Sequence, residues 1–452
     1  VEDAYALEQR ADIKATDDYF LEEAWRANSR VLTWQMIPGT AIVRDRKLQE
    51  PGQHDSFFVF GSSGNVADFK DKVVQHGAGK QISTKKKLLK QAKKIEKALP
   101  EAIKKPLRRI ADSAGITGIL TSGGSKSIDP ERSRMVGEML GGGIKGDPVL
   151  FTKARAEFDN KYIATHGENS MIHAAEAFMS YSAKESEDKV RLAWWSKPFP
   201  GNFGDWLSPL MISHYTDAKV VLQSPVKPAS KPHLISLGSI GRFIKSNSVV
   251  VGTGISTDDI ELNRKAKYVS VRGPITARVL KESGGPSIDT FGDPGLALSR
   301  VIPVTRGATN GKIAFIRHFS NTSIPMQLPE NMEELSVMMS RQHDIADFVA
   351  KLATYDSVLT SAMHVMITCQ SYGIPCGLVT FEGYEENVHG SGIKYEDYAL
   401  GAGVEVMNPQ VVGLDLSKRD LSNLIRDIKV SEAKKDEVIS HIKLGLQSLG
   451  KK

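Results

Sequence analysis

Between residues 190 and 300 the chain alternates short apolar runs with helical patterns. The short runs are rich in β-branched residues, and we predict strands in RLAWW, KVVLQ, HLISLGS, SVVVGTG and YVSVRG. We predict helices in WLSPLMISHY and PITARVLKESG. The second helix has Pro274 in its first turn and Gly284 at its end, a common pair of start and stop residues.

A second series of the same kind follows residues 299–311, which we interpret as a linker. Strands are predicted in KIAFIRHFS, DSVLTS and CGLVTF, and helices in MEELSVMM, DIADFVAKLA and MHVMITCQSYG. Two such series predict an α/β fold with two Rossmann-like domains, each a parallel sheet with helices on both faces. We place the domains at residues 188–300 and 311–412, followed by C-terminal helices at 413–452.

The first 187 residues have a different character and form an additional N-terminal region, α+β or helical. DYFLEEAWRAN has a helical pattern, SRVLTWQMI and DSFFVFGSSG resemble strands, and residues 150–187 indicate helix with a break near Gly167. GGGIKG at 141–146 satisfies GxGxxG, but the preceding SRMVGEML looks helical, whereas a dinucleotide-binding turn follows a strand. We therefore expect no dinucleotide there and assign no function to this region.

The positive charge of the chain is concentrated in one segment. The net charge is +6, yet residues 81–110 hold eleven Lys or Arg and two Glu, a net +9, which leaves 6 − 9 = −3 for the remainder. Leu88, Ala92, Ile95 and Leu99 recur there at helical spacing, with lysines around the rest of the circumference. The segment is either a solvated surface helix or an anchor on an anionic membrane surface. No aromatic residues lie among the lysines, so we expect no nucleic-acid partner.

Composition and cysteine usage indicate a cytoplasmic protein. The 452 residues are 40% hydrophobic and 25% charged, which is ordinary for a soluble globular protein. No apolar run approaches the roughly 20 residues of a membrane-spanning helix, and the acidic N-terminus VEDAYALEQR is no secretory signal. Cys369 and Cys376 lack metal-ligand spacing and fit reduced core cysteines. We expect a cytoplasmic location, peripheral to the inner face of the membrane if 81–110 is an anchor.

Polar residues follow the predicted strands of the first series. Ligands of parallel sheets bind outside the carboxyl ends of the strands, so these residues are candidates for a site. Asn202 and Asp205 lie in the loop after RLAWW, and Asp205 either takes part in chemistry or caps the next helix. Arg272 precedes a helix start and either binds an anion or pairs with a structural carboxylate. Further candidates form an amide nest of anion-binding size: Gly252, Thr253 and Gly254.

The second series contributes five more candidates. Arg317 and His318 end the strand KIAFIRHFS, although they also fit a surface turn. His364 follows DSVLTS at the start of a helix, and a lone histidine there is either a core residue or a catalytic one. The remaining two are Glu382, in an acidic loop, and Lys394. Their recurrence at equivalent strand ends favours a site over isolated structural roles.

Six motifs in order resemble the polysaccharide pyruvyl transferase family, most of all its exopolysaccharide ketal-pyruvyl transferase branch. They are GNFGDWLSPLM, VVVGTGI, VSVRGPITARVL, FGDPGLAL, TSAMHVMITCQSYGIPC and GIKYEDY, and they cover about residues 190–400. The resemblance implies a GT-B-like pair of domains and transfer of a pyruvyl group from phosphoenolpyruvate (PEP) to a glycan as a ketal. PEP is then the donor substrate, and neither a cofactor nor a metal is required.

The resemblance also implies roles for individual residues. His364 matches the family's strand-end histidine and Arg272 the arginine of its VRG motif, whereas Ala362 stands where many members have arginine. Arg272, Arg317, Lys394 and the Gly252–Gly254 segment are then candidates for PEP binding, and Asn202 and Glu382 for the acceptor. His364, His318 and Asp205 are the candidate acids and bases. The acceptor is a glycan, in this family often lipid-linked.

Two other functions remain open from the sequence. One is a glycosyltransferase of the same two-domain layout that uses a nucleotide sugar, for which the EGYEE loop is the candidate ribose-binding segment. The other is a non-catalytic glycan-binding protein of the same fold, which would tolerate the loss of His364 and Arg272.

Overall fold

The computed structural model describes residues 31–37, 40–46, 56–61, 129–417 and 419–450, and the chain divides into two compact units. The smaller unit comprises the described residues up to 141 together with 149–168. Its antiparallel sheet has the order β1-β2-β3, with β1 at Val31–Ile37, β2 at Thr40–Arg46 and β3 at Ser56–Gly61. The sequence predicted β1 and β3 but missed β2. Residues 81–110 lie outside the described residues.

Helices α6 and α7 and the start of α8 follow this sheet in the chain. They span Pro130–Lys145, Pro148–Asp159 and His166–Ser182. The GGGIKG string lies at the end of α6, so the helix predicted for the preceding SRMVGEML is confirmed. The break predicted near Gly167 lies at residues 160–165 instead, and Gly167 belongs to the first turn of α8.

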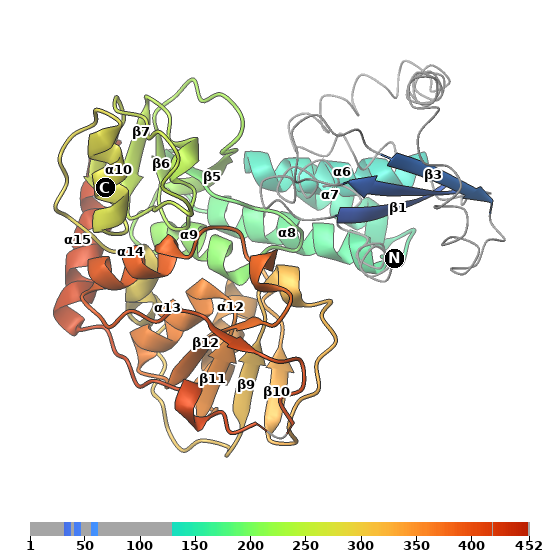
Figure 1. The fold of residues 1–452 in the computed structure, drawn as a ribbon. Helices are drawn as coiled ribbons and strands as arrows, with labels where there is room; N and C mark the ends of the chain where they lie inside the picture. The colour runs from blue at the N-terminus through green and yellow to red at the C-terminus, as the bar shows by residue number, and fades with distance from the viewer. Residues whose placement is uncertain (1–30, 38–39, 47–55, 62–128, 418, 451–452) are drawn as a thin grey trace. The chain divides into compact units, whose positions relative to one another are not determined.

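The larger unit contains two parallel five-stranded sheets, so the predicted α/β fold is confirmed (Figure 1). The first sheet has the order β5-β4-β6-β7-β8. Its strands are β4 Lys189–Ala193, β5 Lys219–Gln223, β6 His233–Ile235, β7 Ser248–Val251 and β8 Lys267–Ser270. The second sheet has the order β10-β9-β11-β12-β13. Its strands are β9 Ile313–Ile316, β10 Met332–Leu335, β11 Ser357–Thr360, β12 Cys376–Phe381 and β13 Gln410–Val412.

Both sheets therefore have the doubly wound strand order 2-1-3-4-5. In this topology the chain leaves the first and third strands in opposite directions, which opens a crevice at their carboxyl ends. The crevice lies between β4 and β6 in the first sheet and between β9 and β11 in the second. These are the positions at which the fold leads us to expect a ligand.

Helices connect the strands of the larger unit. The α-helices are α9 Phe203–His214, α10 Pro274–Glu282, α11 Leu298–Val301, α12 Gln342–Leu352, α13 Met363–Tyr372, α14 Ile393–Ala402 and α15 Glu432–Ser448. The 3-10 helices are η2 Gly241–Phe243, η3 Pro294–Ala297, η4 Phe319–Asn321, η5 Glu385–Asn387 and η6 Ser422–Leu424. No helix in the described part of the chain is long and apolar enough to cross a bilayer.

The prediction of a helix at MEELSVMM is wrong. Met332–Leu335 form β10, an edge strand whose residues pair with β9 from Met332↔Ile313 to Leu335↔Ile316. Beyond β10, Met338 forms a bridge with Asn202, with Phe203 N donating to Val337 O (2.8 Å). These long-range pairings override the local pattern. They also join the loop after β4 to the second sheet.

The last two α-helices return to the first sheet. Helix α14 packs against α10, and α15 packs against β7 and β8 (Figure 1). The contact of α14 with the first domain is close, because a Cβ at Gly273 would lie 1.7 Å from Asp397 O. Residues of α14, which follow the second sheet in the chain, are thereby held beside the VRG segment of the first.

Candidate functional site

The crevice of the second sheet brings His318 and His364 together. Strand β9 ends at Ile316 and β11 at Thr360, and the two following loops share the Ser361 hydroxyl. Ser361 Oγ accepts hydrogen bonds from His318 N (2.8 Å) and from Asn321 Nδ2 (3.1 Å). His364, the second residue of α13, is 15% exposed. Its position at the crevice fits the catalytic interpretation better than that of an ordinary core histidine.

The His364 ring lies between α9 and the FGDPG segment. A Cβ at Gly204 would stand 2.5 Å from His364 Nδ1, so only glycine allows this approach. On the other side, Nε2 lies 3.7 Å from Asp293 Oδ2. Both of these atoms are buried and neither has a hydrogen-bond partner within the described residues. The ring is thus fixed from two sides by α9 and by the segment before η3, which both belong to the part of the chain that carries the first sheet.

Asp205 lies in the first turn of α9 and is not its cap. The helix begins at Phe203 after the N-cap Asn202, whose Nδ2 donates to Asp205 Oδ2 (2.8 Å). Burial raises the pKa of Asp205 to about 6, against the Asn202 hydrogen bond and the nearby His364, which both lower it. Asn202 therefore orients the Asp205 carboxyl group. A carboxyl group with this pKa can exchange a proton near neutral pH.

His318 is neutral at physiological pH. Burial lowers its pKa to about 3, and the charges of Lys394 and His364 contribute. Its Nδ1 accepts from Ser320 N (3.3 Å), and since a backbone N–H can only donate, the ring proton resides on Nε2. His318 is thus a neutral hydrogen-bond donor, which makes it less suited to act as a general acid than the sequence suggested.

Lys394 brings a titratable cation to the same place. It lies in the first turn of α14, and its Nζ donates to His389 O (2.8 Å). Burial, together with the charge of Arg272, lowers its pKa to about 7. The charge of Lys394 also lowers the pKa of His318. His364, His318, Asp205 and Lys394 thus form one cluster.

Arg272 is completely buried behind this cluster. Its Nε donates to Asp397 Oδ2 (3.0 Å), Nη1 to Ser239 Oγ (2.7 Å) and Nη2 to Ile255 O (2.5 Å). Of the two interpretations of Arg272 from the sequence, the structure favours pairing with a structural carboxylate. The Arg272–Asp397 pair joins the segment after β8 to α14. Gly254 leaves room for the guanidinium, since a Cβ there would lie 2.3 Å from Arg272 Cζ.

The amides proposed as an anion nest are mostly occupied. Gly252 N donates to Ser270 O (3.0 Å) and Gly254 N to Gly238 O (3.0 Å), while Thr253 Oγ1 also donates to Gly238 O (2.8 Å). Gly252 has φ +76°, and a Cβ there would lie 2.4 Å from Pro294 Cδ. These residues shape the walls behind Arg272 and Asp293 instead of presenting free amides.

The two remaining candidates are Arg317 and Glu382. Arg317 donates to both oxygens of Glu334 on β10 (2.7 and 2.9 Å), and its Nη1 donates to Asn321 O and Ile324 O. These bonds give it a structural environment. Glu382 is exposed at the end of β12.

The sequence interpretation missed Asp293. It belongs to FGDPGLAL, which carried part of the resemblance, yet no role followed from an aspartate before Pro-Gly. In the structure it is fully buried, and its Oδ1 accepts from Gly295 N (2.9 Å) at the start of η3. The sequence signal was an acidic residue directly before Pro294-Gly295, a common helix-capping position.

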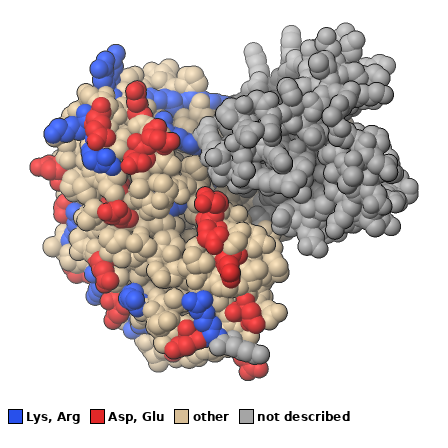
Figure 2. Space-filling view, in the orientation of Figure 1, with Lys and Arg blue, Asp and Glu red and all other residues tan. Residues whose placement is uncertain are grey.

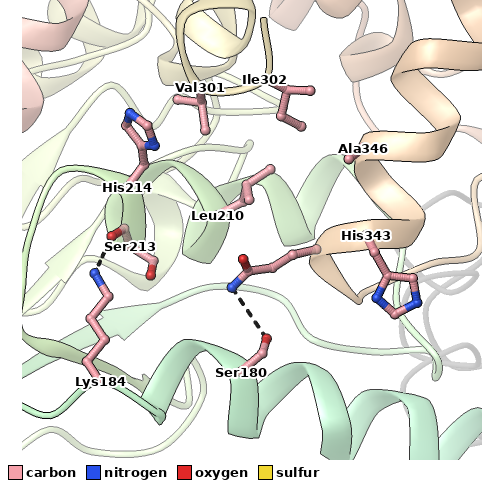
Figure 3. Close-up of a pocket in the computed structure, with 10 residues that line it drawn as sticks. Ser180, Lys184, Leu210, Ser213, His214, Val301, Ile302, His343 and Ala346 are labelled. Atoms are coloured by element: carbon pink, nitrogen blue, oxygen red, sulfur yellow. Dashed lines mark hydrogen bonds between the residues drawn. The ribbon is translucent and has the colours of Figure 1, made fainter.

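A separate cavity of about 630 Å³ lies among α8, α9, α11 and α12 (Figure 3). Leu210, Val301, Ile302 and Ala346 form its apolar lining. Lys184 Nζ, at one end, donates to Ser213 O (2.5 Å). None of the candidate residues is among the described residues that line it, so we do not place the site there.

Comparison with known proteins supports the resemblance. Residues 226–381 match the model of the family described as polysaccharide pyruvyl transferase, which confirms the resemblance over that segment. The segment includes Arg272, Asp293, His318 and His364, whereas Asp205 and Lys394 lie outside it. The "Uncharacterized protein L143" of Acanthamoeba polyphaga mimivirus is 26% identical over 208 residues, 45% of this chain and 72% of that protein. No solved structure gives a significant match.

Proposed function

We propose that the protein transfers a pyruvyl group from PEP to two hydroxyl groups of a glycan sugar and so forms a cyclic ketal. The family match supports a polysaccharide pyruvyl transferase domain. The observation that carries the proposal is the position of His318 and His364 at the crevice of the second sheet, beside Asp205. No cofactor is needed, because PEP itself supplies the activated three-carbon group.

The reaction needs a proton donor and a proton acceptor. A proton is added to the PEP methylene carbon, and the adjacent carbon becomes an oxocarbenium-like centre. One sugar hydroxyl attacks this centre and gives its proton to a base, and the C–O bond to phosphate breaks. A second hydroxyl then attacks the same carbon, gives its proton to the departing phosphate and closes the ring. The products are the ketal and inorganic phosphate.

The four clustered residues match these requirements. His364, which follows the second sheet and contacts α9 and Asp293, transfers a proton. Asp205 is the base that accepts a hydroxyl proton, because its pKa of about 6 leaves it largely ionised at neutral pH. The His318 Nε2–H donates to a developing negative charge without being consumed as an acid. Lys394 is the cation for the phosphate or carboxylate of PEP, and Arg272 holds α14, and therefore Lys394, in place.

A ligand screen followed by a turnover assay tests the proposal. We expect PEP to raise the melting temperature and common nucleotide sugars to leave it unchanged. With a glycan extract we expect phosphate release from PEP, lost in His364→Ala. His343→Ala is the matched control, because His343 is 66% exposed on α12 and lines the separate cavity.

Each alternative gives a different result. A shift with a nucleotide sugar and none with PEP would replace the proposal with a glycosyltransferase. Glycan binding that survives His364→Ala, with no phosphate release from the unmodified protein, would indicate a non-catalytic binding protein.

A further inference from the structure

The Asp293 carboxyl group has one oxygen that the local fold does not use. Oδ1 accepts from Gly295 N (2.9 Å) and caps η3, which is all that a cap at this position requires. Oδ2 is buried without a partner within the described residues. Burying a carboxylate oxygen without a hydrogen-bond partner costs free energy, so we look for a second role of the Asp293 side chain.

The unused oxygen faces a second buried atom that lacks a partner. Asp293 Oδ2 and His364 Nε2 are 3.7 Å apart, and no hydrogen bond to either atom is found among the described residues. Hydrogen bonds of catalytic groups are often long in a ligand-free protein and shorten when substrate binds. A small rotation of either side chain brings the pair within hydrogen-bond distance.

We infer that Asp293 is a positioning residue, whose Oδ2 accepts a hydrogen bond from His364 Nε2–H and so fixes the tautomer of the ring. The proton then resides on Nε2, and Nδ1 carries the lone pair that exchanges protons with the reactants. This inference rests on the proposed function, in which His364 transfers protons. The other titratable groups of the cluster are Asp205 on α9, His318 after β9 and Lys394 on α14.

The geometry makes Asp293→Asn an informative substitution. The asparagine oxygen can still accept from Gly295 N, which places the amide NH2 opposite His364 Nε2. The facing group thereby changes from an acceptor to a donor. His364 Nε2 must then accept, and the proton moves to Nδ1.

The first measurement is the ¹⁵N spectrum of histidine-labelled protein, in which the two tautomers have distinct ring-nitrogen shifts. The His364 signals are identified by their loss in His364→Gln. We expect Nε2–H in the unmodified protein and Nδ1–H in Asp293→Asn. The second measurement is phosphate release from PEP, where we expect kcat to fall by about 10²–10⁴-fold, the range of general acid–base catalysis, with a much smaller change in KM for PEP.

Asp356→Asn is the matched control. Asp356 Oδ1 also accepts from a glycine amide, Gly311 N (3.0 Å), but it lies before β11, at the opposite end of the strand from His364. This variant should keep both the rate and the His364 spectrum. If Asp293→Asn does not fold, Asp293→Ser retains a cap without the facing oxygen and should leave His364 as a mixture of tautomers.

The outcomes separate this inference from the proposed function. An unchanged His364 tautomer in both Asp293 variants, or an undiminished kcat in Asp293→Asn, would overturn the positioning role. If the unmodified protein releases no phosphate from PEP with any acceptor, the proposed function fails. The spectrum still reports whether Asp293 orients His364.

Discussion

Replacing Gly204 with alanine tests the geometry of the site directly. The added Cβ would lie 2.5 Å from His364 Nδ1 and 2.9 Å from its Cβ, closer than carbon atoms approach in folded proteins. Gly204 has ordinary helical backbone geometry near the start of α9, so alanine introduces no backbone strain. The substitution therefore acts mainly by displacing the His364 ring.

The expected effects on stability and on activity differ greatly. Overpacking costs about 1–3 kcal/mol, and replacing a helical glycine with alanine returns about 0.5–1 kcal/mol. The free energy of unfolding should thus fall by only about 0–2.5 kcal/mol. A displacement of about 1 Å at a reacting group lowers the rate by about 10²-fold, so we expect phosphate release from PEP to fall at least that much.

Calorimetry and the phosphate-release assay measure the two effects on the same sample. Gly141→Ala is the control, because Gly141 is also helical but a Cβ there meets nothing within 4 Å. It should keep full activity and lose no stability. Full activity in Gly204→Ala would refute the assignment of His364 as a proton-transfer group in this position.

Three further predictions follow from the charges of the site and of the N-terminal segment. The folded-state pKa of Asp205, about 6, is above its usual 3.8, so the folded protein binds an extra proton between these values and loses stability as pH rises from about 4 to 6. Asp205→Asn should remove this loss and be inactive. At pH 8, but not at pH 4, it should unfold at a higher denaturant concentration than the unmodified protein. If the two proteins are equally stable at both pH values, the burial argument is contradicted. Lys394 loses its charge as pH rises through about 7, so calorimetric titration should show PEP binding weakening by up to about tenfold per pH unit above that value, with no such trend in Lys394→Met. Neutralising the lysines of residues 81–110 should abolish sedimentation with anionic vesicles but not PEP turnover, and undiminished sedimentation would exclude the segment as a membrane anchor.

The sheets and the crevice could be predicted from the sequence because they depend on local pattern and on general topology. Short apolar or β-branched runs predicted eight of the ten parallel strands. The edge strand β10 is half polar and was mistaken for a helix, and the three-residue edge strand β13 was not predicted. His318 and His364 were found for the same reason, since parallel strands end at one edge of their sheet.

The face of the described residues seen in Figure 2 has interspersed acidic and basic side chains, in keeping with the local origin of the net charge.

The partners of the charged residues could not be predicted, because they lie far away in the chain. Arg272 pairs with Asp397, 125 residues later, and only the return of α14 to the first domain brings them together. A strand-end arginine gives the same sequence signal whether it binds a ligand or a buried carboxylate. The burial of Asp293 beside His364 is equally a product of packing between distant segments.

The position of Arg272 gives the site a physical link between the two sheets. Asp397 accepts from Arg272 Nε and also from Thr276 N (2.9 Å), so the start of α10 and the middle of α14 share one carboxylate. Lys394 lies one turn before Asp397 on the same helix, and its charge acts on His318 at the end of β9. Removing either partner would leave a buried charge unpaired, at a cost of about 3–5 kcal/mol. Through its bond to Asp397, Arg272 can therefore set the distance between Lys394 and the histidines.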